Sequence, residues 1–109
     1  MRVQIAARHC EVPDTIRERT EDQLGKLSKY DPSLSGAEVV FEVEKHMKKV
    51  DAVLSIDRSE PVVASGEGVE FREALDQMVD RLSRILKRRR TQLKDRQRSG
   101  GSEPPVPET

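Results

Sequence analysis

"AEVVFEVEK" at residues 37–45 decides the fold, because every second residue is apolar and three glutamates stand between them. Successive side chains point to opposite faces of a β-strand, so this pattern predicts a strand with one buried face and one solvated face. The residues expected to face the core are Ala37, Val39, Phe41 and Val43, and those expected to face solvent are Glu38, Glu42 and Glu44. Residues 50–58 alternate in the same way, and residues 61–67 supply a third short strand. The links between these strands are short, which predicts an antiparallel meander.

The rest of the chain predicts one more strand and two helices. Residues 2–8 alternate like a half-buried strand, and residues 11–31 change to the helical period. "DPSLSG" at 31–36 predicts a loop, and from about residue 69 the helical period returns. A strand that reaches its neighbour through a helix pairs with it in parallel. We therefore expect an α+β fold of order β-α-β-β-β-α, with a four-stranded sheet and two helices packed on one face.

The second predicted helix is longer than the core that it covers. Its apolar stripe ends at Leu86, yet no helix-breaking residue occurs before Ser99. A helix of about 28 residues spans roughly 42 Å, whereas a domain of this size has a radius of gyration near 13 Å, so we expect the end to overhang. Residues 1–98 are predicted to form one domain. Residues 99–109, "SGGSEPPVPET", are predicted to be a disordered acidic tail rich in Gly and Pro.

Cysteine content and hydropathy predict the compartment. Cys10 is the single cysteine, so no internal disulfide forms, which fits a reducing cytoplasm. No apolar run approaches the roughly 18–20 residues of a membrane span, and the N-terminus is too polar for a secretion signal. We expect a soluble cytoplasmic protein that binds no membrane.

Charge is distributed unevenly along a chain whose formal net charge is zero. Residues 81–98 hold nine Arg or Lys against one acid, whereas residues 1–80 hold 11 basic and 17 acidic groups. On a helical wheel Arg81, Arg84 and Arg88 form one basic ridge opposite the apolar stripe, and Lys87, Arg90 and Lys94 form a second ridge. Arg89 falls on the apolar face. Solvation and the helix dipole explain two or three basic residues near a helix end. They do not explain nine basic residues, so we predict that this segment binds a polyanion through its phosphates.

The scarcity of aromatic residues narrows the choice of polyanion. Phe41 and Phe71 occupy core positions, so Tyr30 is the only aromatic residue expected at the surface. Proteins that bind single strands use several stacking platforms, and membrane-surface helices carry bulky anchors. With single strands and membranes disfavoured, the remaining interpretation is that the protein recognises the backbone and shape of structured RNA. The outward face of the sheet carries Glu38, Glu42, Glu44, Asp51 and Asp57, so RNA is expected on the helical side.

Catalysis, metal binding and cofactor binding are not predicted. His9, Cys10 and His46 lack the spacing of a zinc site, and no arrangement of base and nucleophile is visible. Residues 65–68 are Gly-rich but lack the Lys of a phosphate loop, and we expect them to form the bend into the second helix. Two roles are equally consistent with Lys45, Lys48 and Lys49: contact with RNA, or keeping the turn between two strands soluble. We expect no cofactor and no small-molecule substrate.

Five segments in order resemble a known family. They are "EVPDTIRERTEDQLGKLSKY", "EVEK", "DAVLSI", "ASGEG" and "ALDQMVDRLSRILKR". Over about residues 2–96 the chain resembles the ribosome hibernation promoting factors, also called ribosome-associated translation inhibitors or the sigma-54 modulation protein family, in a short form. The resemblance implies a fold related to double-stranded-RNA-binding domains. It also implies binding to the small ribosomal subunit and its 16S-type rRNA, where tRNA and mRNA otherwise sit, so that the whole ribosome is held inactive under stress or in stationary phase.

The resemblance also implies particular RNA-binding residues. Basic groups of the family stand at Arg81, Arg84 and Arg88, and the ending of its first helix matches Lys26, Lys29 and Tyr30. Lys87, Arg89, Arg90 and Lys94 match less regularly. Pro13 stands where the family usually has a hydroxyl N-cap. Long members add a C-terminal dimerisation domain that has no counterpart here, so pairing of ribosomes through that domain is not expected. We also expect a monomer off the ribosome.

Two other functions fit the basic helix. It could dock an acidic partner protein, as an interaction module, or it could bind double-stranded RNA in general.

Overall fold

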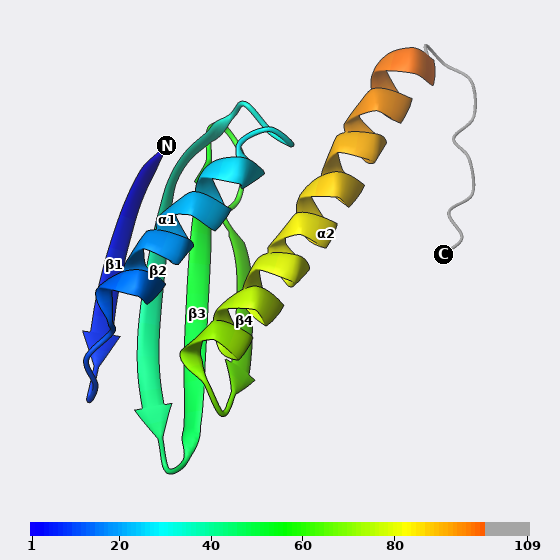
Figure 1. The fold of residues 1–109 in the computed structure, drawn as a ribbon. Helices are drawn as coiled ribbons and strands as arrows, with labels where there is room; N and C mark the ends of the chain where they lie inside the picture. The colour runs from blue at the N-terminus through cyan, green and yellow to red at the C-terminus, as the bar shows by residue number, and fades with distance from the viewer. Residues whose placement is uncertain (100–109) are drawn as a thin grey trace.

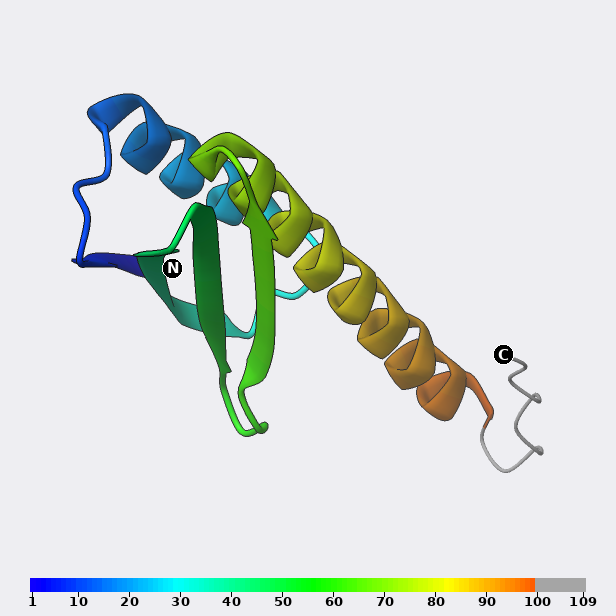
Figure 2. The same cartoon turned by 90° about the horizontal axis from the view of Figure 1, so that it is seen from below.

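The fold is seen in a computed structural model that describes the backbone of residues 1–99 and the side chains of residues 1–90. The elements are β1 (Arg2–Arg8), α1 (Asp14–Leu27), β2 (Leu34–Glu44), β3 (Met47–Ile56), β4 (Val62–Gly68) and α2 (Phe71–Ser99). Both helices cover the same face of one sheet, and the other face is open (Figures 1 and 2). The predicted α+β order is confirmed. Except for Ser99, the predicted tail at 99–109 lies outside the described residues.

The sheet has the predicted connectivity. Its strand order is β1-β2-β3-β4. β1 pairs with β2 in parallel, and the other two pairs are antiparallel. The tight turns after β2 and β3 place Lys45 and Arg58 at φ 58° and φ 60°. The parallel pair follows from the helix that connects its strands, and the meander follows from the short links.

Two predicted loops are partly wrong. The loop predicted at 31–36 is shorter, because β2 begins at Leu34, which pairs with Ile56 and is buried. An irregular register between Leu34 and Gly36 keeps this start of the strand in the sheet. The bend predicted at 65–68 lies instead at 69–70, since β4 continues to Gly68. Glycine and serine predict turns by their local preferences, and strand pairing overrides those preferences here.

The core lies between the sheet and the two helices. Phe41 and Leu54 of the sheet meet Leu75 of α2 and Leu24 of α1, and all four are fully buried. Phe41 also packs edge-to-face on Phe71 at the start of α2, with the ring centroids 5.6 Å apart. Burying one such side chain contributes about 1.5–3 kcal/mol. The inward residues predicted for β2 and β3 are buried as expected, except Val43, which is partly buried.

The start of α2 is fixed by its own first turn. The Glu73 carboxylate accepts hydrogen bonds from the backbone N–H of Val69 at 2.9 Å and of Glu70 at 3.3 Å. An acidic side chain three residues into a helix satisfies donors that lack a partner in the helix, and it also faces the positive end of the dipole. The first turn of α2 is therefore held where β4 ends.

α1 is tied to α2 by an ion pair. The Arg19 guanidinium donates two hydrogen bonds to the Asp76 carboxylate, each at 3.1 Å. Both side chains are partly exposed, so the pair contributes at most roughly 1 kcal/mol.

α2 approaches β4 most closely at Gly66. A Cβ placed on Gly66 would lie 2.2 Å from the Ala74 carbonyl oxygen and 2.8 Å from the Met78 nitrogen. Both are helix backbone atoms that no side-chain rotation moves. The helix therefore lies against bare strand backbone at this point, and only glycine fits.

We predict opposite effects for two glycine substitutions. Gly66→Ala pushes α2 off β4 and should lower the free energy of unfolding by about 1–3 kcal/mol. Gly25→Ala is the control, because nothing lies within 4 Å of a Cβ there and the site is inside α1. That change should raise the free energy of unfolding by about 0.5–1 kcal/mol. Urea unfolding measures both. Equal stability of Gly66→Ala and the parent protein would contradict the close approach.

Candidate RNA-binding surface

The first predicted ridge of α2 exposes two arginines. Arg84 pairs with Asp80 at 3.2 Å, one turn earlier on the helix, and the Arg84 side chain remains 77% exposed. Such exposed pairs contribute about 0.3–0.5 kcal/mol, so a phosphate can replace the carboxylate. Arg88 is exposed and has no ion pair within residues 1–90. Both guanidinium groups are therefore available to an anionic backbone.

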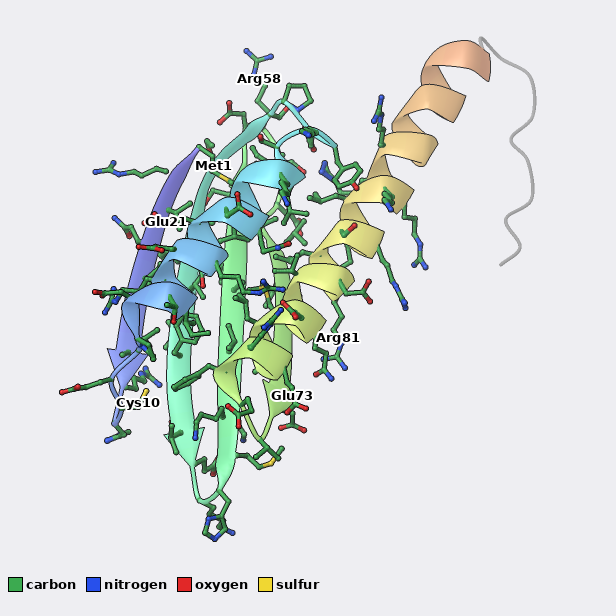
Figure 3. All side chains as sticks on the ribbon, viewed as in Figure 1. Met1, Cys10, Glu21, Arg58, Glu73 and Arg81 are labelled. Carbon is green, nitrogen blue, oxygen red and sulfur yellow. The ribbon has the colours of Figure 1, made fainter. Side chains whose placement is uncertain are left out.

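Arg81, the third member of this ridge, also contacts its own chain. One of its amino groups donates a hydrogen bond to the Ser65 carbonyl oxygen at 2.6 Å. One turn earlier, the Gln77 side-chain oxygen accepts a hydrogen bond from the Glu67 N–H at 3.0 Å. β4 is an edge strand, and Arg81 lies on the β4 side of α2 (Figure 3). Arg81 therefore satisfies an edge of the sheet as well as carrying charge.

The second flank of α2 lies beside the end of α1. The Lys87 ammonium group sits 5.3 Å from the centre of the Tyr30 ring, a cation–π contact. Lys26 and Lys29 are exposed on the last turn of α1 and just beyond it, and Lys26 pairs with Asp22 at 3.5 Å. The structure thus brings Tyr30 into contact with Lys87, although about 60 residues of sequence separate them, and Lys26 and Lys29 belong to the same end of α1.

Arg89 is oriented differently from the other basic residues. It faces the body of the domain, as its wheel position predicts, and its guanidinium contacts Asp31 at 3.2 Å and the Ser59 hydroxyl at 3.0 Å. The exposed fraction of its side chain is 26%. Arg90 is exposed, and the side chain of Lys94 lies outside the described residues.

The open face of the sheet carries the opposite charge. Its exposed or partly exposed acids are Glu38, Glu42, Glu44, Asp51 and Glu67, and Asp57 follows β3. The lining of a hollow of about 380 Å³ at the β4 edge includes three of these acids, Glu42, Asp51 and Glu67, together with Lys49 and Arg81. These carboxylates disfavour phosphate. Acids outnumber bases on this face, which also carries Lys49 of β3 and Arg2 and Arg8 of β1, whereas the cations of α2 and of the end of α1 lie on the helical side.

Comparison with known proteins identifies the family of this chain. The model of the family described as sigma 54 modulation protein / S30EA ribosomal protein matches residues 3–94. The chain belongs to this family. The resemblance recognised in the sequence is confirmed.

Members of the family with curated names are similar over most of their length. The ribosome hibernation promoting factor of Azotobacter vinelandii is 29% identical over 108 residues, covering 98% of this chain and 100% of that protein. The protein of the same name in Escherichia coli K12 is 31% identical over 94 residues, covering 86% and 98%. None of these names describes an enzyme.

Solved structures share the fold. A ribosomal subunit interface protein from Coxiella burnetii superposes with a TM-score of 0.77 at 22% identity, covering 84% of this chain and 99% of that one. The N-terminal domain of Thermus thermophilus Protein Y gives a TM-score of 0.73 at 26% identity, covering 81% and 98%.

The residues that the sequence analysis set aside as catalytic or metal-binding candidates are described next. The Cys10 thiol is partly buried and lies 3.7 Å from the Phe41 carbonyl oxygen, and His9 has a φ of 57°. Lys48 lies over the Phe71 ring at 5.4 Å. In the part of the chain that the structure describes, no three His, Cys, Asp or Glu side chains gather as metal ligands. No described helix is long and apolar enough to cross a membrane.

Several contacts of the surface were missed by sequence reasoning. Asp31 and Ser59 hold Arg89, and Gln77 shares the β4 edge with Arg81. The one available signal was "DPS" at 31–33, because an Asp followed by Pro favours a turn in which its side chain bonds the backbone two residues on. The Ser33 N–H does donate to the Asp31 carboxylate at 2.9 Å.

We predict a pH effect from one ion pair of the open face. The Lys49 ammonium donates a hydrogen bond to the Glu44 carboxylate at 2.5 Å, and this contact lowers the pKa of Glu44 and raises the pKa of Lys49. Because the pKa of Glu44 is lower in the folded state than its usual value of 4.5, the ion pair stabilises the fold fully at pH values above 4.5. This stabilisation is lost as the pH falls through the pKa of the folded state.

Lys49→Gln should therefore raise the pKa of Glu44 and flatten the acid limb of the stability curve. An NMR titration of the Glu44 carboxyl carbon measures the shift. Lys45→Gln removes the same charge from the adjacent turn and should leave this pKa low. An unchanged Glu44 pKa in Lys49→Gln would show that the pair does not form.

Proposed function

We propose that this protein binds the small ribosomal subunit in the channel for tRNA and mRNA and holds ribosomes inactive during stress or stationary phase. The observation that carries the proposal is the concentration of exposed cations on both flanks of α2 and at the end of α1, opposite an acidic sheet. The names of its relatives, ribosome hibernation promoting factor, support ribosomes as the target.

Binding would proceed through RNA phosphates. Arg84, Arg88 and Arg90 are exposed on a continuous helix, so their backbone positions are fixed before contact. Each cation that meets a phosphate releases condensed counterions, which makes the affinity large at low salt and steeply dependent on salt. Inhibition needs no chemistry, because a folded domain that occupies the channel excludes tRNA and mRNA. The proposal needs no cofactor, and it requires only a monomer in the cytoplasm, where ribosomes are.

The arrangement favours structured RNA over single strands. Tyr30 is the only tyrosine, and its ring already carries the Lys87 ammonium group. A single ring offers no series of stacking platforms. The two flanks of α2 face different directions, so each can follow a separate sugar–phosphate strand of folded RNA. The acidic open sheet would face away from the RNA.

We predict that charge reversal at the first ridge weakens ribosome binding. Arg84→Glu with Arg88→Glu removes two phosphate contacts and adds repulsion, which should weaken cosedimentation with small subunits by roughly ten- to a hundredfold and reduce the salt slope by about two. Arg81 is left intact because it also holds β4.

The matched control is Arg2→Glu with Arg72→Glu. It changes the net charge equally, at exposed sites in β1 and in the first turn of α2. Equal binding of the ridge variant and the control variant would contradict the proposal. RNase should release the protein from its heavy complex. Retention after RNase would indicate a protein partner, and equal binding to arbitrary duplexes would indicate a general RNA-binding domain.

We also predict that Tyr30 reports binding. Because the chain has one tyrosine, incorporation of 3-fluorotyrosine gives a single fluorine NMR signal. Small-subunit RNA at the second flank should broaden and shift that signal at low salt, and high salt should restore it. Tyr30→Phe identifies the signal by removing it. An unperturbed signal in a sample whose protein cosediments with RNA would exclude the end of α1 from the interface.

A further inference from the structure

Leu86 is the last buried apolar residue of α2 among the side chains that the structure describes. Leu86 is fully buried, whereas Lys87, Arg88 and Arg90 are exposed. Arg89 lies where the stripe would continue, and its side chain is the last one described on α2 that contacts the loops of the domain. Arg89 is therefore a contact between the basic end of α2 and the body of the domain that lies beyond the buried stripe.

Arg89 joins two loops that are far apart in sequence. One nitrogen of its guanidinium donates to the Asp31 carboxylate after α1 at 3.2 Å, and another donates to the Ser59 hydroxyl between β3 and β4 at 3.0 Å. The Asp31 side chain is only 12% exposed. A pair this sheltered is screened less by salt than the exposed pair of Arg84 and Asp80.

The loops that carry the two acceptors are held by hydrogen bonds that do not involve Arg89. The other carboxylate oxygen of Asp31 accepts from the Ser33 N–H at 2.9 Å, and the Leu34 N–H donates to the Asp31 carbonyl at 3.1 Å. The two loops are themselves joined, because the Asp57 N–H donates to the Ser33 carbonyl at 3.0 Å. Arg89 thus meets a rigid site on the body of the domain.

We propose that Asp31, Ser59 and Arg89 form a latch that positions the basic end of α2 for RNA, and that Arg89 is a positioning residue within the surface. The inference rests on the proposed function. The lever is long: Ser99 lies about 15 Å beyond Arg89 along the axis, so a tilt of about 10° moves it by about 2.6 Å. A shift of that size takes a cation out of hydrogen-bond distance of a phosphate.

Asp31→Asn separates the latch from simple electrostatics. The change makes the protein more positive by one charge, so charge alone predicts equal or tighter binding to RNA. Asparagine can still accept from the Ser33 N–H, which preserves the turn. The latch predicts the opposite result, a roughly three- to tenfold weaker affinity for small subunits, because the helix end is no longer held.

The matched control is Asp80→Asn. It also adds one positive charge, and it releases Arg84 instead of Arg89. Its affinity for small subunits should be unchanged or up to about twofold tighter. Equal affinities of Asp31→Asn and Asp80→Asn would overturn the latch. A double-mutant cycle with Arg89→Gln adds a further check, since the effects of Asp31→Asn and Arg89→Gln should not add if the two residues act as a pair.

Hydrogen exchange of the free protein tests the latch without ribosomes. The backbone amides of α2 near Arg89 should exchange roughly three- to tenfold faster in Asp31→Asn and should keep the parent rate in Asp80→Asn. Equal exchange in both variants would overturn the latch even if ribosome binding is confirmed. If the parent protein fails to bind small subunits, the proposed function is wrong, and exchange alone decides whether the latch holds α2.

Discussion

The close seating of α2 on β4 is the constraint on which the rest of the structure depends. At Gly66 the helix backbone touches strand backbone, and from there the stripe from Leu75 to Leu86 lies along the sheet. This contact fixes the angle of α2 against the sheet, and the length of the helix carries its end past the sheet (Figure 1). The basic surface is therefore a consequence of core packing. Residues that never meet RNA decide where the cations are held in space.

Charge separation follows from the same geometry. A sheet with one buried face must place its polar side chains on the other face, and here most of the charged ones are acidic. A helix that packs by one stripe must turn its remaining flanks outward, and here the exposed side chains from Arg81 to Arg90 are basic. The family relationship then gives this dipolar arrangement a biological setting, because the relatives are ribosome hibernation promoting factors. Repulsion from the acidic face would help to set which side of the domain approaches RNA.

The sequence predicted the features that arise from periodicity. Alternation at residues 37–45 and 50–58 identified the strands and their inward residues, and the 3.6 period identified the long helix and its basic flanks. Features that depend on contacts between distant segments could not be predicted in this way. The start of β2 at Leu34 depends on its pairing with Ile56, which outweighs the turn preferences of its neighbours. The partners of Arg81 and Arg89 come from loops and strands tens of residues away, so a helical wheel gives their direction but not what they bind.

The pair of side chains that covers the edge of β4 has a consequence for solubility. Gln77 and Arg81 occupy one N–H and one C=O that would otherwise be a template for a strand from another molecule. Unpaired N–H and C=O groups on an edge strand favour edge-to-edge aggregation when copies of a protein meet at high concentration. The same helix that carries the exposed arginines thereby also hinders another strand from adding to the β4 edge.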